Sequence, residues 1–338
     1  MASVPFVGRH SRDRECARAA LDARGPTRDA LPPMTAPSFR LAHLSDPHVG
    51  PLSRPRLHQL LGKRATGYAN WRRGRSRSHD MAVLAALVAD LRAQAPDHIA
   101  CTGDLCNIGL PSEWETARVF LEALGAPETV SFVPGNHDAY VRGSLEGLLA
   151  ACDGWTVDDG GLGGTFPYLR RRGPLALVGL STAIPTKPFV ASGRLGPAQI
   201  AAAEALLRAL ATEPGRPCRV VLIHHPPHPG GASPGRELTD AKGFAAMIAR
   251  TGAELILHGH NHITSLAGLS GPNGAQVPVV GAASASARPG AHGPSAARRA
   301  AYLLFSFARE GERHVISARQ RGLDPDGNIV DLGALALV

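Results

Sequence analysis

The sequence lacks any apolar run that could cross a membrane, because none reaches the roughly eighteen uncharged residues that a transmembrane helix needs. Its first residues also lack the basic flank, apolar stretch and small-residue cleavage site that together mark a signal peptide. These two absences predict a cytoplasmic protein. They leave open a peripheral contact with the inner face of the membrane.

A disulfide framework is also absent. The five cysteines are odd in number and follow no zinc-ribbon spacing: Cys16, Cys101, Cys106, Cys152 and Cys218. This pattern favours reduced thiols over a set of structural bridges. We interpret Cys101 and Cys106, which flank a candidate metal ligand, as small core residues.

Acidic residues are missing from one stretch, residues 51–78, which holds eight Lys/Arg. Residues 1–78 carry 15 basic and 5 acidic residues, whereas residues 79–338 carry 21 basic and 23 acidic ones, so the net charge of +8 belongs to the N-terminal quarter. Tyr68 and Trp71 lie among the basic residues, and the spacing of leucines at 57, 60 and 61 predicts a short amphipathic helix.

Several interpretations of this basic insertion stay open. It could form a lid over an anionic substrate, or it could contact an anionic membrane surface. Basic residues with interleaved aromatics can also follow a nucleic-acid backbone. The plainest interpretation is a basic surface loop that covers an apolar ledge.

The rest of the chain alternates strand and helix patterns, and 44% hydrophobic residues suffice for a globular core. Strands are predicted at residues 39–45, 97–102, 129–134, 175–180, 219–223, 254–257, 276–280, 301–307 and 314–319. Helices are predicted at residues 80–94, 112–124, 197–210 and 236–250. This order is typical of an α/β sheet, whose ligand site lies outside the carboxyl ends of the strands.

Polar motifs follow five of the predicted strands. They are Asp46-Pro47-His48, Gly103-Asp104, Gly135-Asn136-His137-Asp138, His224-His225 and His258-Gly259-His260-Asn261-His262. Carboxylate and amide oxygens together with imidazole nitrogens are metal ligands, and three histidines within five residues strongly indicate a metal site. His137 can donate or accept a proton near neutral pH, and Asp138 can orient its ring through the other nitrogen.

In this order, the motifs Asp-x-His, Gly-Asp, Gly-Asn-His-Asp, His-x-Pro and Gly-His-x-His resemble the calcineurin-like metallophosphoesterase superfamily, which includes bacterial phosphodiesterases and phosphohydrolases. The five blocks lie in register over roughly residues 39–265. The resemblance implies a four-layer α/β/β/α sandwich of two mixed β-sheets. It also implies a two-metal site at the carboxyl-end edge of these sheets.

The resemblance further implies a role for each matching residue. Asp46, His48 and His262 would hold the first metal, and Asn136, His224 and His260 the second, with Asp104 bridging the two. His137 would contact the phosphoryl group of the substrate or protonate the leaving group, with Asp138 orienting it. The spacing leaves His225 open as an alternative to His224, and His258 is interpreted as a packing residue or a support for the ligands.

Mixed His, Asp and Asn ligation suits Mn²⁺, Fe²⁺/Fe³⁺ or Zn²⁺ better than Ca²⁺ or an all-oxygen Mg²⁺ site. Two such cations lower the pKa of bound water, so a bridging hydroxide could attack phosphorus. We therefore expect a metal-dependent phosphohydrolase that cleaves a phosphodiester or phosphomonoester of a small substrate, with phosphodiesterase as the leading assignment.

Two further functions remain as alternatives. One is a pyrophosphohydrolase of a lipid-linked nucleotide, of the UDP-diacylglucosamine type, which would use residues 51–78 at the membrane surface. The other is a binding scaffold without catalysis, which the complete ligand set disfavours. A nucleic-acid partner is disfavoured because no nucleic-acid module is present, and the oligomeric state is left open.

The expected domain division has three parts. Residues 1–38 form a flexible N-terminal extension, and Met34 leaves open whether residues 1–33 belong to the mature protein. Residues 39–320 form the metallophosphoesterase domain, which contains the basic insertion at 51–78. Residues 321–338 form a C-terminal tail.

Overall fold

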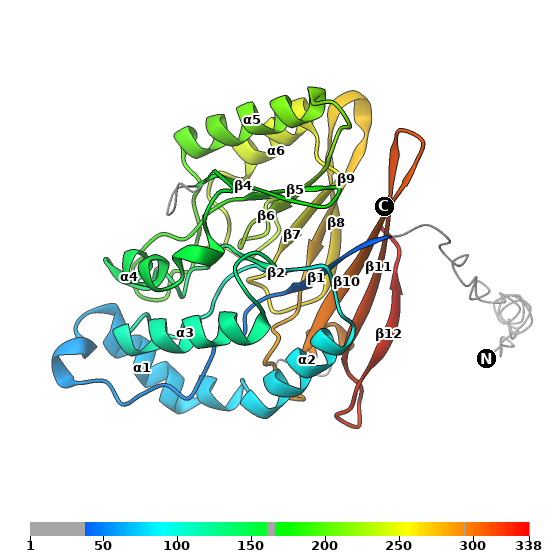
Figure 1. Cartoon of the computed structure of the whole chain (residues 1–338). Coiled ribbons are helices and arrows are strands. Elements are labelled where there is room, and N and C mark those ends of the chain that lie inside the picture. Colours follow the sequence, from blue (N-terminus) through cyan, green and yellow to red (C-terminus); the bar gives the residue numbers. More distant parts are fainter. Residues whose placement is uncertain (1–37, 161–165, 292, 294, 338) are drawn as a thin grey trace, which may run out of the picture. The chain divides into compact units, whose positions relative to one another are not determined.

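The computed structural model describes residues 38–160, 166–291, 293 and 295–337. The predicted N-terminal extension therefore lies, except for Ser38, outside the described residues. The described chain forms two six-stranded mixed sheets, ordered β12-β11-β10-β1-β2-β3 and β4-β5-β6-β7-β9-β8. These two sheets pack face to face in the middle of the domain (Figure 1).

Each sheet contains a run of adjacent parallel strands, which forms one side of the first sheet and the centre of the second. The first sheet contains β1 (Phe39–Leu44), β2 (His98–Cys101), β3 (Val130–Phe132), β10 (Ala301–Glu310), β11 (Arg313–Leu323) and β12 (Ile329–Leu335). The second contains β4 (Tyr168–Arg172), β5 (Leu175–Gly179), β6 (Cys218–Leu222), β7 (Leu255–His258), β8 (Ser265–Ser270) and β9 (Gln276–Gly281). Because β1, β2 and β3 run parallel, as do β5, β6, β7 and β9, their carboxyl ends lie at one edge of each sheet.

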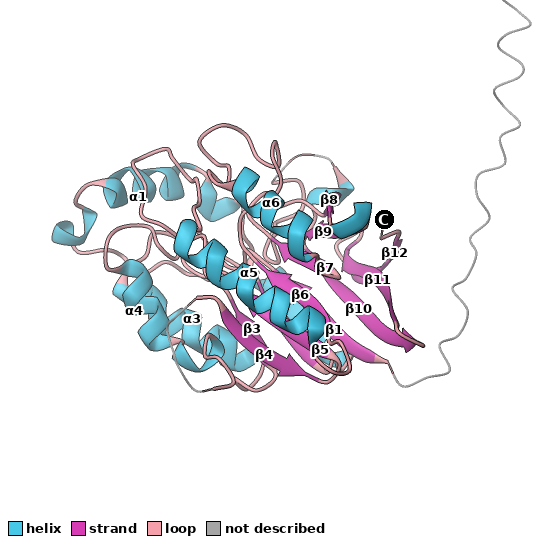
Figure 2. Ribbon diagram, turned by 90° about the horizontal axis from the view of Figure 1, so that it is seen from above, coloured by secondary structure: helices cyan, strands magenta, loops and turns pink. Residues whose placement is uncertain are grey.

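Helices cover the outer face of each sheet (Figures 1 and 2). The first sheet is covered by α2 (Met81–Ala93) and α3 (Pro111–Leu124), and the second by α5 (Pro197–Thr212) and α6 (Ala241–Thr251). Two further helices, α1 (Lys63–Arg73) and α4 (Ser144–Ala151), lie in the connections. This arrangement confirms the four-layer α/β/β/α sandwich.

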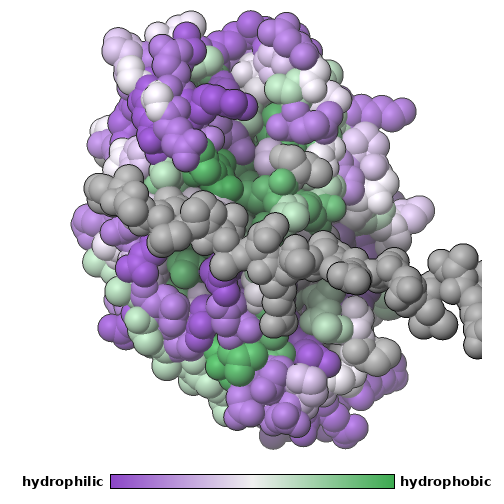
Figure 3. All heavy atoms as spheres, turned by 90° about the vertical axis from the view of Figure 1, so that its right-hand side faces the viewer, coloured by the Kyte–Doolittle hydropathy of each residue, from purple (hydrophilic) through white to green (hydrophobic). Residues whose placement is uncertain are grey.

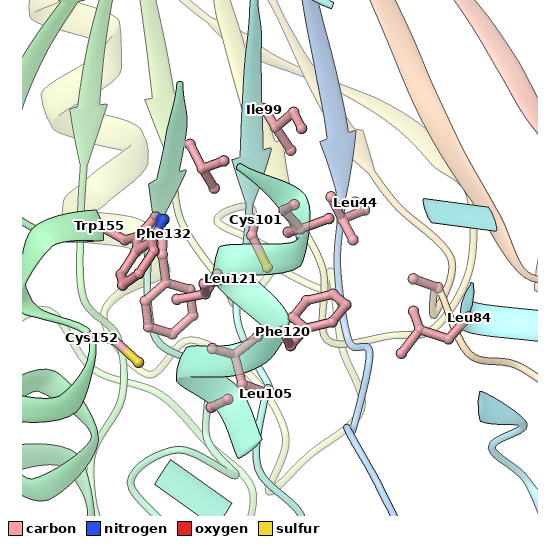
Figure 4. Close-up of a cluster of buried hydrophobic side chains, with 14 of the residues drawn as sticks. Leu44, Leu84, Ile99, Cys101, Leu105, Phe120, Leu121, Phe132, Cys152 and Trp155 are labelled. Carbon is pink, nitrogen blue, oxygen red and sulfur yellow. The ribbon is translucent and has the colours of Figure 1, made fainter. Parts of the chain in front are cut away.

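Three hydrophobic clusters hold the layers together. The central one lies between the sheets, where Leu41, Leu177 and Phe305 are fully buried. A second lies between the first sheet and its helices, where Phe120 and Leu121 of α3 face the strands (Figure 4). The third joins α5 and α6 to the second sheet. Since both faces of these parallel strands are covered, most of their residues are apolar and buried.

Helix α2 shows how local sequence produces this packing. The side chain of Asp80 accepts hydrogen bonds from the backbone N–H groups of Ala82 and Val83, which satisfies two donors at the start of the helix. Leucines at 84, 87 and 91 recur at helical spacing and are buried against the first sheet.

The predicted C-terminal tail at residues 321–338 is wrong as far as the structure describes it, because β11 runs through residue 321 and β12 follows as the edge strand. Arg321 binds the Asp90 carboxylate of α2 through two nitrogens at 2.7 and 2.8 Å. Tyr302 donates a third hydrogen bond to that carboxylate at 2.7 Å. The last strands are therefore tied to the helical layer.

The four cysteines among the described residues are free and buried, in agreement with the expected reduced thiols: Cys101, Cys106, Cys152 and Cys218. Cys16 lies outside the described residues.

Every helix within the described residues is too short or too polar to span a membrane. The face that carries the C-terminal strands is mainly hydrophilic, with hydrophobic side chains in smaller patches (Figure 3).

Leu87→Ala tests the packing of α2. Leu87 is fully buried, so the truncation should lower the free energy of unfolding by about 2–5 kcal/mol. The matched control is Leu57→Ala, because Leu57 is 89% exposed and its truncation should cost about 0.5 kcal/mol or less. Urea unfolding of the metal-stripped variants measures both, and equal losses would contradict the assigned packing.

Candidate metal centre

The predicted ligands, together with the predicted catalytic residue His137, lie in the loops that leave five parallel strands. Asp46 and His48 follow β1, Asp104 follows β2, Asn136 and His137 follow β3, His224 follows β6, and His260 and His262 follow β7. Most of these side chains are buried, with exposed fractions of 0–4% for Asp46, His48, Asp104, Asn136, His224 and His260. Strands from both sheets therefore deliver them to one place, while their roles as ligands stay predictions.

The first cluster contains Asp46, His48, Asp104 and His262, whose ligand atoms all lie within 4.8 Å of one another. His48 Nε2 is 3.2 Å from His262 Nε2 and 3.7 Å from Asp104 Oδ2. His262 Nε2 is 3.3 Å from Asp46 Oδ1. Two carboxylates and two imidazoles thus converge on a space that suits one cation.

The second cluster contains Asn136, His224 and His260. The Oδ1 atom of Asn136 is 3.3 Å from His224 Nε2 and 2.8 Å from His260 Nδ1. His224 Nε2 is also 3.5 Å from Asp104 Oδ2, the oxygen that faces the first cluster. Asp104 therefore lies between the two clusters.

Backbone carbonyls orient two of the imidazoles. His48 Nδ1 lies 3.0 Å from the carbonyl of Cys106, and His224 Nδ1 lies 2.6 Å from that of Thr102. A ring that donates its Nδ1–H to a carbonyl keeps the lone pair on Nε2. In both residues Nε2 is the atom that faces Asp104, so each ring, when neutral, directs its Nε2 lone pair toward the shared space.

The electrostatics centre on Asp104. Burial alone would raise the pKa of its carboxyl group, but His224 and the other nearby histidines outweigh burial and hold that pKa well below its usual range. Burial likewise disfavours the charged ring of His224, yet the Asp104 carboxylate raises the pKa of His224 to about 9. Asp104 is therefore an anionic carboxylate that attracts positive charge, as a ligand that bridges two metal ions must be.

The backbone is strained at the same residues. Asp46, His48, Asp104, His260 and His262 all have positive φ angles, between 40° and 71°. Residues other than glycine rarely adopt this left-handed conformation, and such strain gathers at functional sites. Five predicted ligands therefore hold conformations that their own residue types disfavour.

Two glycines permit the close approach of these loops. A Cβ atom at Gly135 would collide with Asp104 Oδ1, and one at Gly259 would collide with Ser45 Oγ and Asp46 Oδ2. Any other residue at these positions would displace a predicted ligand.

The structure distinguishes the neighbouring histidines that the sequence left open. Both ring nitrogens of His225 have partners outside the clusters, namely Thr182 Oγ1 at 2.7 Å and the Ala191 carbonyl at 3.0 Å. His258 is buried in β7 and contacts the carbonyl of Gly259 through Nδ1. His224 is therefore the residue of its pair that faces the clusters, and His258 lies in the packing behind them.

His137 lies beside the clusters with its ring directed to the cavity. Its backbone N–H donates to Asp104 Oδ1 at 2.7 Å, and its Nδ1 lies 2.5 Å from the carbonyl of Asn107. Its Nε2 accepts a hydrogen bond from the Arg75 guanidinium at 2.7 Å. Burial, followed by the charge of Arg75, lowers the pKa of His137 to about 3.

Asp138 does not orient His137, so that interpretation is wrong. The carbonyl of Asn107 takes the Nδ1–H of His137, while the Asp138 carboxylate accepts hydrogen bonds from three backbone N–H groups at 2.8–2.9 Å: those of Asp104, Cys106 and Gly135. Asp138 is fully buried, and burial together with the nearby Asp104 raises its pKa to about 7. It is a positioning residue that joins two ligand loops.

Two residues that the motifs did not include complete the site. Arg75 comes from the basic insertion and donates to His48 Nε2 at 3.1 Å as well as to His137. The ring centroids of His79 and His48 lie 4.6 Å apart. His79 could hold a cation together with His48 and His262. Neither residue belongs to a sequence motif that identifies it as a site residue. The absence of acidic residues around Arg75 did indicate that this segment suits an anionic partner.

The basic insertion packs against the domain beside the site. The 3₁₀ helix at Leu57–Leu60 replaces the predicted amphipathic helix and buries none of its residues, and α1 follows it. The stacked rings of Tyr68 and Trp71 cover an apolar ledge that includes Tyr140. These two aromatic side chains therefore pack against the domain, which agrees with the interpretation of the segment as a basic surface loop that covers an apolar ledge.

Two cations of α1 fix the insertion to neighbouring loops. Lys63 Nζ donates to Thr186 Oγ1 at 2.6 Å and lies 4.5 Å from the centre of the Tyr140 ring. Arg64 donates to the carbonyls of Ile108 and Gly109. The insertion is therefore held over one side of the site.

A cavity of about 940 Å³ opens above the two clusters. The residues that line it include His137, His260, His262, Arg75 and Arg236. The donor set beneath it fits divalent cations: buried carboxylates meet imidazole lone pairs, and His260 Nε2 has no hydrogen-bond partner among the described residues. The arrangement can bind metal and receive an anionic ligand from solvent.

Comparisons with known proteins agree with this geometry. The family model of the calcineurin-like phosphoesterases matches residues 39–264. The chain is 28% identical over 225 residues to the glycerophosphodiester phosphodiesterase GpdQ of Enterobacter lignolyticus (strain SCF1), an alignment that covers 66% of this chain and 70% of that protein.

Two solved structures are similar in fold. The purple acid phosphatase PPD1 from yellow lupin seeds matches with a TM-score of 0.53 and 14% identity, over 88% of this chain and 53% of that one. A 5′-nucleotidase precursor from Thermus thermophilus matches with a TM-score of 0.48 and 18% identity, over 83% and 54%. This chain spans about half the length of both, and at such identities the likeness to the phosphatase concerns the fold alone.

Asp138→Asn tests the positioning role of Asp138. The substitution keeps the shape of the side chain but turns an acceptor oxygen into an amide that faces a backbone N–H, so it should lower the free energy of unfolding by about 1–3 kcal/mol. The control is Asp153→Asn, because Asp153 is exposed and accepts one local hydrogen bond from Gly154. Urea unfolding of metal-stripped protein in alkaline buffer checks this, and an unchanged Asp138→Asn variant would refute the role.

Proposed function

The chain belongs to the calcineurin-like phosphoesterase family, and on that premise we propose that it is a two-metal phosphodiesterase of a small phosphorylated substrate. The family consists of hydrolases that use divalent metals. The relative GpdQ, by its name a phosphodiesterase, favours diester over monoester cleavage in this chain as well.

One observation carries the proposal of two metals. The Oδ2 atom of Asp104 lies 3.7 Å from His48 Nε2 and 3.5 Å from His224 Nε2, so it faces both clusters. Asp46, His48 and His262 would complete the first set of ligands. Asn136, His224 and His260 would complete the second. Manganese, iron or zinc suits this mixture of donors.

When bound, two divalent cations supply hydroxide at neutral pH and neutralise charge on the phosphoryl oxygens. The residues of this chain do the rest. His137 lines the cavity beside the clusters, where its ring can contact the phosphoryl group or the leaving oxygen of a bound ester. The Asn107 carbonyl orients that ring, and the Asp138 carboxylate holds the loop that carries it. No side chain is required as a nucleophile.

Hydrolysis of two chromogenic esters tests the proposal. Metal-stripped protein should be inactive, and added Mn²⁺ should restore turnover of bis(p-nitrophenyl) phosphate in preference to p-nitrophenyl phosphate. His137→Ala should reduce kcat by about 10²- to 10³-fold, because the loss of one positioned polar group at a reacting centre typically costs that much.

The control is His58→Ala, because His58 is exposed in the 3₁₀ helix of the insertion and should leave turnover unchanged. Diester turnover that does not depend on metal, or that survives in His137→Ala, would contradict the proposal.

A contact with an anionic membrane surface is a second proposal, and Leu57 and Leu61 favour it. They are 89% and 75% exposed and follow two exposed arginines, Arg54 and Arg56, at the tip of the insertion. Exposed apolar side chains beside basic ones suit an anionic lipid surface. The lipid-linked nucleotide alternative depends on this contact, and nothing in the cavity favours it over a small diester.

Liposome binding tests the membrane contact. Leu57→Ser combined with Leu61→Ser should reduce co-sedimentation with phosphatidylglycerol vesicles severalfold, while diester turnover stays the same. Leu266→Ser is the matched control, because Leu266 is 39% exposed on β8, outside the insertion. Equal binding of the double variant and the unaltered protein would exclude this surface.

A further inference from the structure

We propose that Arg75, Arg236 and Arg298 form an anion-binding subsite beside the metal centre, so that the preferred substrate carries a second negatively charged group besides the scissile phosphate. This inference rests on the proposed function, because it concerns the substrate of the same site. The observations that carry it are the position of each guanidinium and the balance of charge in the cavity.

Arg75 is the innermost of the three. Its two terminal nitrogens donate to His137 Nε2 at 2.7 Å and to His48 Nε2 at 3.1 Å. Among the described residues it forms no ion pair with a carboxylate. A partly buried guanidinium is costly without an anionic partner, since neutral rings compensate its charge only in part. An anion in the cavity would supply that partner.

The insertion holds Arg75 in place. The 3₁₀ helix Arg75–Arg77 follows α1 directly, and α1 packs so closely that a Cβ atom at Gly67 would collide with the hydroxyl of Tyr140. Lys63 and Arg64 tie the other end of α1 to neighbouring loops. Arg75 is thus positioned before a substrate arrives, which reduces the entropy lost on binding.

Arg236 and Arg298 line the same cavity from the second half of the chain. The guanidinium of Arg236 reaches the carbonyl of His260 at 3.5 Å. Arg298 closes the 3₁₀ helix Ala296–Arg298. Neither side chain forms an ion pair within the described residues, so both are available to an anion.

The lining of the cavity is strongly positive. It contains three arginines, whereas Asp104 is its one acidic residue within the part of the chain that the structure describes. A diester phosphate carries a single negative charge, which the metal centre itself would attract. Three guanidiniums therefore exceed what that phosphate can neutralise, and arginine is well suited to bind a further phosphate or carboxylate through two hydrogen bonds.

The cavity also has the size and chemistry for such a group. Its volume of about 940 Å³ far exceeds that of one phosphate, and it lies near the upper end of the range for small-molecule sites. Asn70, Ser78, Ser233 and Asn261 add neutral donors, and no Phe, Tyr or Trp is among the described residues that line it. Charge rather than stacking would therefore select the substrate.

Two chromogenic diesters that differ by one phosphate test the proposal. They are thymidine 5′-(p-nitrophenyl phosphate) and its 3′-phosphorylated derivative, which share the scissile bond and the leaving group. With Mn²⁺-loaded protein, the 3′-phosphorylated ester should have a KM about tenfold lower at similar kcat, because each tenfold step corresponds to about 1.4 kcal/mol of binding.

Arginine variants assign the effect. Arg236→Gln combined with Arg298→Gln should abolish the preference for the 3′-phosphorylated ester, and Arg75→Gln should raise KM for both esters. The matched controls are Arg77→Gln, exposed in the same 3₁₀ helix as Arg75, and Arg299→Gln, which lies next to Arg298 and lines a different hollow. Equal KM values for the two esters, or equal losses in the controls, would overturn the proposal.

Calorimetry separates this inference from the proposed function. Thymidine 3′,5′-bisphosphate should bind the Mn²⁺-loaded protein about tenfold more tightly than thymidine 5′-monophosphate, and the difference should shrink at high salt. This readout needs no turnover. A protein that cleaves neither ester but keeps the difference in affinity would refute the proposed hydrolysis alone, whereas equal affinities would refute the subsite.

Discussion

The position of the Asp104 carboxylate is the constraint on which the site depends. One of its oxygens faces His48 and His224, and the other accepts the backbone N–H of His137. These three residues come from loops that follow three strands in two different sheets. The carboxylate can contact all of them only because the sheets pack face to face and the carboxyl ends of their parallel strands lie together. The apolar layer between the sheets, with Leu41 and Phe305 at its centre, therefore sets the spacing of the polar cluster at its edge.

Local backbone strain is the consequence of that convergence. Left-handed conformations at Asp46, Asp104 and His262 turn each side chain from the end of its strand into the shared space. Such conformations persist only where the surroundings hold them. The Asp138 carboxylate does so for two loops at once through three backbone hydrogen bonds, which explains why an acidic side chain is fully buried there without touching the cavity.

The apolar runs and the motifs that directly follow them predicted an α/β sheet with a ligand site at the carboxyl ends of its strands. The four-layer arrangement was predicted from the resemblance of these motifs to the calcineurin-like family, and the structure confirms it. The strands that the sequence did not predict are β4, β8 and β12, and each is an edge strand. An edge strand is partly exposed, so polar residues such as the three arginines of β4 mask its pattern. Arg75 and His79 were not recognised as site residues because only the docking of the insertion brings them near His48. The role of Asp138 was assigned wrongly because adjacency in sequence does not determine which carbonyl takes the Nδ1–H of His137.

The central claim is that Asp104 is shared by two metal ions. Anomalous diffraction from crystals of the Mn²⁺-loaded protein, measured at the manganese absorption edge, tests it most directly. The account predicts two anomalous peaks about 3.5–4 Å apart, the usual separation in two-metal sites, with the Asp104 carboxylate in contact with both. A single peak, or two peaks of which only one contacts Asp104, would contradict it.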